Sequence, residues 1–272
     1  MENKKTPYRA VHNLEELGLG ADSNCVRILW MYPDSLSIHG GRGDIMALLR
    51  FATMGRIPVE IRRVELLTDP VPLGEADMLY FCCGDLTCMP DIIKALEPVR
   101  VDLEQFAAQG KVIVANGSTG AILAKELKLL DGTVVPGLGL LGMHWTQRKT
   151  VQGDDLWLKA MDDIEVIGNE IKLAEITLEP DQEPFGMVRY GHGNCGDGKE
   201  GAVSGNVMYT SCLGPLLVRN PDLAMALLKR AAAAAGLDTC PEQFLLREED
   251  ISHERACLEE AKRFIEKKLQ KK

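Results

Sequence analysis

Short apolar runs alternate with stretches of helical period through the first half of the chain. Four runs are apolar enough to be strands of a buried sheet, and they span residues 25–32, 58–64, 76–83 and 112–115. Helical spacing of apolar residues separates them, as in Ile45, Leu48, Leu49 and Ala52 and again across 89–109. Strands that alternate with helices predict an α/β fold with a doubly wound, mostly parallel sheet flanked by helices.

The second half of the chain differs in composition and in the pattern of its apolar runs. Residues 134–217 are richer in glycine and in short strand-like runs, and they follow a helix predicted over 121–129. A helix is expected from Pro221 to about 235, and a charged one over about 250–270. We therefore expect a loose polar leader over 1–24, one α/β domain over 25–236 and a C-terminal helical extension over 237–272.

Composition excludes several classes of protein. A formal net charge of −9 argues against a broad nucleic-acid footprint, which needs a basic face. No apolar run approaches the roughly 20 residues that span a bilayer, and no apolar stretch follows the first residues, so we expect a cytoplasmic protein. The eight cysteines include no CxxC pair and are expected to be mostly small buried residues, with no metal and no cofactor.

Two of the predicted strands end in segments suited to chemistry. In doubly wound folds ligands bind beyond the carboxyl ends of the strands, which here are Cys82–Asp85 and Asn116–Gly120. The second is a sharp strand-to-helix elbow, whose tip residue is often held in a left-handed conformation that Asn116 would tolerate. Asn116 could equally be a plain turn or capping residue. The candidate ligand-binding residues are Gly84, Asp85, Gly117, Ser118 and Thr119.

Four motifs in order along residues 26–230 resemble one known family. They are YPDSLSIHGGRGD from Tyr32, PGLGLL from Pro136, YGHGN with DGKEG from Tyr190, and TSCLGPLL followed by Asn220-Pro221. Together they resemble the CobB/CobQ-type class I glutamine amidotransferases, most closely the GatD-like subunits of lipid II isoglutaminyl synthase. The resemblance implies a flavodoxin-like amidotransferase fold, a role in peptidoglycan and cell wall biogenesis, and a Mur-ligase-like partner.

The same resemblance indicates that the active site is degenerate. The family's elbow reads C-G-G-Y-Q, and here Asn116 stands at the position of the nucleophilic cysteine. The family's histidine base belongs to an L-H-G-P motif, and here that position is Leu213. Because the reaction needs a thiolate and a proton acceptor, the resemblance implies a pseudoenzyme that scaffolds or regulates a ligase.

Other chemistry stays open from sequence alone. A relocated site could use Cys83 or Cys212 with His39, His144 or His192, which would make the chain an active amidotransferase or related hydrolase supplying ammonia for cell-wall or cobyrinate amidation. Glutamine or another small anion is then a possible ligand. A metal site built from Cys82, Cys88 or Cys195 matches no tetrahedral spacing. The GRGD segment at 41–44 is typical of a phosphate-binding or turn loop, and no Walker sequence is present.

Overall fold

A seven-stranded sheet forms the centre of the protein. The computed structural model describes residues 10–237 and 244–270. The strand order is β1–β3–β2–β4–β5–β13–β12. The bounds are β1 Ala10–His12, β2 Val26–Met31, β3 Val59–Val64, β4 Met78–Phe81, β5 Val112–Asn116, β12 Ala202–Ser204 and β13 Val207–Thr210. The five inner strands run parallel, and only the short edge strands β1 and β12 are antiparallel to their neighbours.

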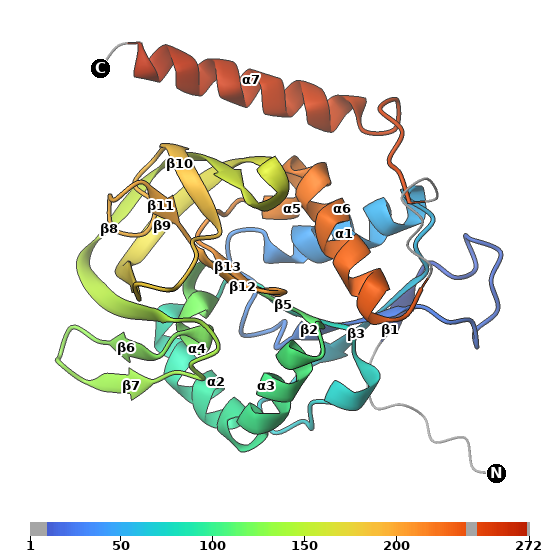
Figure 1. Ribbon diagram of the computed structural model, residues 1–272, viewed down its shortest axis with the longest axis horizontal. Helices are drawn as coiled ribbons and strands as arrows, with labels where there is room; N and C mark the ends of the chain where they lie inside the picture. The colour runs from blue at the N-terminus through green and yellow to red at the C-terminus, as the bar shows by residue number, and fades with distance from the viewer. Residues whose placement is uncertain (1–9, 238–243, 271–272) are drawn as a thin grey trace.

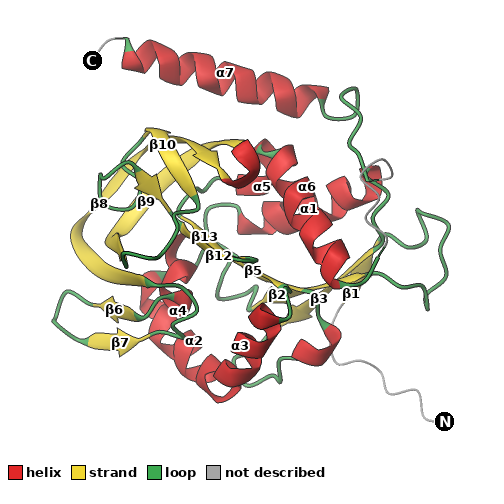
Figure 2. Cartoon of the chain, in the orientation of Figure 1, coloured by secondary structure: helices red, strands yellow, loops and turns green. Residues whose placement is uncertain are grey.

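Helices cover both faces of this sheet, which confirms the doubly wound prediction. Figure 1 shows α1, α5 and α6 on one face and α2, α3 and α4 on the other, and Figure 2 shows the same layers by type of element. Their bounds are α1 Gly41–Met54, α2 Met89–Leu96, α3 Arg100–Ala108, α4 Gly120–Leu123, α5 Leu216–Arg219 and α6 Pro221–Ala234. Every residue of β4 and β5 is buried, as expected of central parallel strands.

A second sheet packs beside the carboxyl ends of the central strands. Its order is β11–β10–β8–β6–β7, and β9 pairs with the other edge of β8. The bounds are β6 Glu126–Lys128, β7 Val134–Pro136, β8 Met143–Ala160, β9 Glu165–Leu178, β10 Gly186–Tyr190 and β11 Lys199–Glu200. β8 and β9 form a long hairpin, bulged between Gln147 and Gln152.

Two of the predicted helices are shaped differently from the expectation. The single helix over 89–109 is split into α2 and α3 by a 3₁₀ turn at Glu97–Val99, because Pro98 has no N–H to continue the helical ladder. The helix predicted over 121–129 was wrong beyond its first turn. Ala124 is extended, and the Lys125 N–H bonds to the Met143 carbonyl, which redirects the chain into β6.

The N-terminal segment is also better ordered than a loose leader. Residues 10–12 form β1 on β3, and the buried Asn13 side chain donates to the Ile57 carbonyl and accepts from the Val59 N–H. The expectation of a loose leader is therefore wrong for residues 10–13, while residues 1–9 lie outside the described part.

The C-terminal helix is present as expected, as α7 over Ser252–Leu269. None of the helices in the described ranges is long and apolar enough to cross a membrane.

Candidate functional site

Three chain segments meet at the carboxyl edge of the central sheet. β5 lies between β4 and β13, with Ala115 opposite Phe81 and Asn116 opposite Thr210. The residues that follow these strands are therefore neighbours, although they lie far apart in the sequence. The candidate residues Cys83, Gly84, Gly117, Ser118, Cys212 and Leu213 gather here.

The tip of the elbow is Gly117 rather than Asn116. Asn116 is extended, with φ −124° and ψ 131°, whereas Gly117 has φ +64° in the left-handed region. The expectation that Asn116 holds the left-handed conformation was wrong. Since the tip residue is the one that an elbow presents to a substrate, Gly117 is the position from which a nucleophile would project.

Asn116 has a structural role instead. Its side-chain Nδ2 donates to the Cys212 carbonyl over 2.6 Å, and its N–H bonds to Thr119 Oγ1 over 3.0 Å. Thr119 is fully buried, and its hydroxyl lies 3.2 Å from the Phe81 carbonyl. Both side chains hold the elbow to neighbouring strands, and neither lines the cavity beside it.

The space in front of Gly117 is already filled. A Cβ atom added there would lie 2.5 Å from Cys83 Sγ and 2.9 Å from Leu213 Cδ2. Contacts this short force neighbouring atoms to move. The thiol from the end of β4 and the leucine after β13 therefore occupy the volume that a catalytic side chain at the tip would need.

Ser118 occupies the other side of the elbow. Its hydroxyl donates to the Gly84 carbonyl over 2.5 Å and accepts from the Gly84 N–H over 3.2 Å, and it lies 3.6 Å from Cys83 Sγ. A backbone N–H at this strand end would otherwise be free to bind an anion. Asp85 points elsewhere: it is exposed and bonds to Thr87.

Neither nearby thiol is poised as a nucleophile. Burial raises the pKa of Cys83 and, more strongly, that of the fully buried Cys212, so both stay protonated at neutral pH. His192 Nε2 lies 3.1 Å from a Glu175 carboxylate oxygen, and His144 lies between Glu126 and Glu179. Across the described ranges, no hydrogen bond joins a thiol to an imidazole.

The cavity that remains at this edge is small. Its volume is about 30 Å³, which holds one or two waters and lies well below the roughly 300 Å³ of an ordinary ligand pocket. The residues that line it are Ile38, His39, Cys83, Gly117, Ser118, Trp145, Ile171, Lys172, Leu173, Ala174, Ile176, Tyr209 and Ser211. A glutamine side chain cannot enter without displacing several of them.

A buried group of charges stands behind this cavity. Lys172 Nζ donates to the Gly193 and Asn194 carbonyls, and Glu170 accepts from the backbone N–H groups of His192 and Gly193. Burial lowers the pKa of Lys172 to about 8 and raises that of Glu170. Backbone carbonyls thus hold the ionised lysine. Lys172 and Glu170 together hold the YGHGN loop, residues 190–194, in place.

Glu200 has a matching task on the next loop. Its carboxylate accepts from the Ser211 N–H over 2.6 Å, from the Ser211 hydroxyl over 2.7 Å and from the Thr210 hydroxyl over 2.9 Å. The family motifs that this chain keeps therefore belong to residues that hold loops in place. No periodic pattern marks this cluster, although an acidic and a basic residue two positions apart on one strand, Glu170 and Lys172, could have suggested it.

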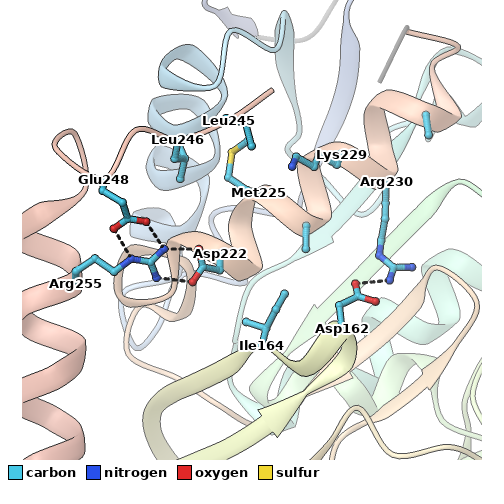
Figure 3. A pocket seen from close by; sticks show the side chains of 12 residues that line it. Asp162, Ile164, Asp222, Met225, Lys229, Arg230, Leu245, Leu246, Glu248 and Arg255 are labelled. Carbon is cyan, nitrogen blue, oxygen red and sulfur yellow. Dashed lines mark hydrogen bonds and ion pairs between the residues drawn. The ribbon is translucent and has the colours of Figure 1, made fainter. Parts of the chain in front are cut away.

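A much larger cavity elsewhere in the protein shares no residue with the elbow. Its volume is about 750 Å³, and it lies between α6, the β8–β9 turn and residues 245–248 (Figure 3). Arg255 pairs with Asp222 and Glu248, and Arg230 pairs with Asp162. Five of its six charged lining residues pair with one another, and among the described residues only Lys229 of this lining makes no ion pair, so the cavity offers little to fix a polar ligand. Within the same ranges, no group of three or more His, Cys, Asp or Glu side chains could hold a metal ion.

A parallel sheet with a strand-to-helix elbow at its carboxyl edge is an arrangement that class I glutamine amidotransferases share with other α/β enzymes. Residues 27–220 match the CobB/CobQ-like glutamine amidotransferase domain, and the chain belongs to that family. This confirms the resemblance seen in the four motifs.

Two relatives agree with this assignment, and one solved structure shares the fold. The chain is 23% identical over 231 residues to the GatD subunit of the lipid II isoglutaminyl synthase (glutamine-hydrolyzing) of Staphylococcus aureus strain N315, covering 85% of this chain and 93% of that protein. It is 26% identical over 210 residues to the GatD subunit of Streptococcus pneumoniae strain R6, covering 76% and 80%. In fold it is similar to a chain of PurLQS from Thermotoga maritima, with a TM-score of 0.50, 15% identity, and coverage of 78% and 97%.

Proposed function

We propose that this chain is a GatD-like subunit that does not hydrolyse glutamine and that acts in the cytoplasm as a scaffold or regulatory partner of a Mur-ligase-like, amide-forming enzyme. The observation that carries the proposal is the filled elbow. The tip residue Gly117 has no side chain, and Cys83 and Leu213 occupy the space in front of it.

The chemistry of amide hydrolysis explains why this arrangement is inert. The reaction needs a thiolate to attack the carboxamide carbon and a base that passes a proton to the leaving ammonia. Neither Asn116 nor Gly117 supplies a nucleophile, and Leu213 exchanges no proton. Loss of such a unit costs on the order of 10⁴–10⁶ in rate.

The role of a subunit is supported by the relatives, since both similar GatD proteins are subunits of a synthase. The buried charges Glu170, Lys172 and Glu200 keep the loops around the elbow in shape. A scaffold needs that shape, whereas it has no use for the reacting groups.

The test is to measure ammonia released from glutamine by the purified chain, alone and with the ligase encoded beside it. We expect no release above the buffer background in either case, and co-purification of the two proteins. Ammonia release at rates typical of the family would overturn the pseudoenzyme, and failure to co-purify would overturn the partner.

A relocated site is the alternative, and one observation favours it: Cys83 and His39 line the same cavity. Against it, the Cys83 thiol lies beside Ser118 and its pKa is raised by burial. The variants Cys83→Ser and Cys212→Ser separate the two ideas. Any ammonia release that either substitution abolishes would establish the relocated site, and release that both leave unchanged would mark a contaminant.

A further inference from the structure

The C-terminal helix α7 lies beyond residues 27–220, the part of the chain that matches the family. Figure 1 shows it as the outermost element, alongside the second sheet and α5. Its apolar contact is small. Leu258 and Ile265 are buried against Trp157, Ile167 and Tyr190, which form a cluster separate from the main core. We refer to these last three residues as the Trp157 face.

Ion pairs add to this contact. They join α7 to four elements of the body: Glu254 to Arg50 on α1, Arg255 to Asp222 on α6, Lys262 to Glu165 on β9, and Lys268 to Asp154 and Asp155 on β8. These side chains are partly exposed, so salt screens their attraction. The contact thus depends on ionic strength far more than the core does.

The fit of α7 to the body is also incomplete. A groove of about 510 Å³ runs beside the helix and is lined mainly by apolar side chains, among them Ile167, Val218 and Ala261. The helix covers Trp157, yet the buried indole Nε1 has no hydrogen-bond partner within the described ranges. The same holds for Trp30 and Trp145 in the main core, so it is the groove that marks the fit of α7 as incomplete.

We propose that α7 is a releasable strap and that the Trp157 face is a helix-docking surface whose resident occupant is α7. The strap leaves as a unit while the α/β body stays folded. A helix with the same pattern then fits the exposed face: two apolar residues seven positions apart, with lysines that meet Glu165, Asp154 and Asp155. A second copy of this chain supplies such a helix, namely its own α7.

Hydrogen exchange of the unmodified chain tests the release. Locally opening elements exchange through low-energy openings, whereas central strands exchange through global unfolding. We expect the amides of 252–269 to exchange faster than those of β5. Raising the salt from about 0.05 to 0.5 M should speed exchange of α7 roughly tenfold more and leave the exchange rate of β5 unchanged. Exchange of α7 in step with β5 at both salt concentrations would overturn the proposal.

Peptide binding tests the docking surface. The variant Leu258→Asp/Ile265→Asp removes both apolar anchors, and Phe264→Asp is the matched control because Phe264 is 57% exposed on the same helix. The probe is a fluorescent peptide of residues 248–270. We expect the release variant to bind it at least about tenfold more tightly than the control or the unmodified chain, in which the tethered helix competes.

Adding Trp157→Ala to the release variant is expected to remove peptide binding. Equal binding by the release variant, the Phe264→Asp control and the unmodified chain would overturn the docking surface. So would the absence of binding by a release variant whose circular dichroism shows a folded body. If the release variant does not fold, the exchange experiment on the unmodified chain still decides whether the strap opens.

Discussion

Asn116 Nδ2 donates a hydrogen bond of 2.6 Å to the Cys212 carbonyl and so ties the end of β5 to the segment after β13. The donor and acceptor are both buried. The Asn116 side chain points along the sheet edge and does not line the cavity. The residue that replaces a cysteine in the aligned motif is therefore a strand connector, and this fact determines what its substitution will do.

Replacing Asn116 with cysteine is expected to destabilise the protein without creating activity. The substitution leaves the Cys212 carbonyl buried without its donor, which costs about 1–3 kcal/mol. Chemical denaturation measures this loss, and an ammonia assay on Asn116→Cys/Leu213→His is expected to stay at background. Appreciable glutaminase activity in that double variant would show that residue 116, not 117, is the functional tip.

Replacing Gly117 with cysteine is expected to destabilise the protein through two separate effects. A side chain at φ +64° costs roughly 1–2 kcal/mol, and overpacking against Cys83 and Leu213 costs about 1–3 kcal/mol more. The matched control is Gly205→Cys, since Gly205 has φ +57° with nothing within 4 Å of an added Cβ. The difference between the two free energies of unfolding isolates the overpacking.

The double variant Gly117→Cys/Cys83→Gly, compared with its two single substitutions, tests whether residues 83 and 117 compete for the same space. We expect it to recover most of the overpacking cost, because the thiol that blocks the new Cβ is gone. Strict additivity of the two single substitutions would mean that residues 83 and 117 do not compete for the same space, against the geometry at the elbow.

Asp44 is expected to make the protein less stable as the pH rises. It is buried on α1, where burial raises its pKa to about 7 from 3.8, and its carboxylate accepts from the Leu217 N–H. The folded state then binds more protons than the unfolded state between these two values. The free energy of unfolding should fall by roughly 1.4 kcal/mol per pH unit between about pH 4 and 7 through this group.

The variant Asp44→Asn isolates that contribution. Its amide oxygen can still accept from Leu217, while it carries no charge to bury. Because Glu170 and Glu200 titrate alike in both proteins, the difference in unfolding free energy between variant and unmodified chain should grow steadily in favour of the variant as pH rises to 7. If this difference in unfolding free energy did not change with pH, Asp44 would not titrate in this range and the expectation of a raised pKa would be wrong.

Lys172 is expected to be structurally essential. Replacing it with methionine keeps the volume but leaves the Gly193 carbonyl without a donor, the Asn194 carbonyl with the Ile176 N–H alone, and Glu170 without a nearby cation. Leaving a buried carbonyl and a buried carboxylate short of a partner costs about 1–3 kcal/mol for each group. Thermal unfolding measures the loss, and Lys199→Met, at an exposed position on β11, is the control.

The parallel sheet could be predicted because its strands are continuous apolar runs, such as Val112–Ala115. The order of the motifs likewise indicated the family. The tip of the elbow could not be assigned, since asparagine and glycine both tolerate a left-handed backbone and stand side by side at 116 and 117. The filling of the site by Cys83 depends on the neighbouring strand, which local patterns do not report.

The second sheet was the part least visible in the sequence. The middle of the β8–β9 hairpin is polar and exposed around residues 147–153, so it lacks the alternation of a half-buried strand. Ala121–Leu129 has helical spacing, yet pairing of residues 126–128 with β8 prevails over that local preference.

The short antiparallel strand β1 has a consequence for how the molecule behaves in a crowded solution. A parallel sheet that ended at β3 would present a row of open N–H and C=O groups, ready to recruit a strand from another chain. Three residues and the anchoring amide of Asn13 close that row. A variant that begins after residue 14 should therefore self-associate through the exposed edge of β3, at concentrations where the full chain does not.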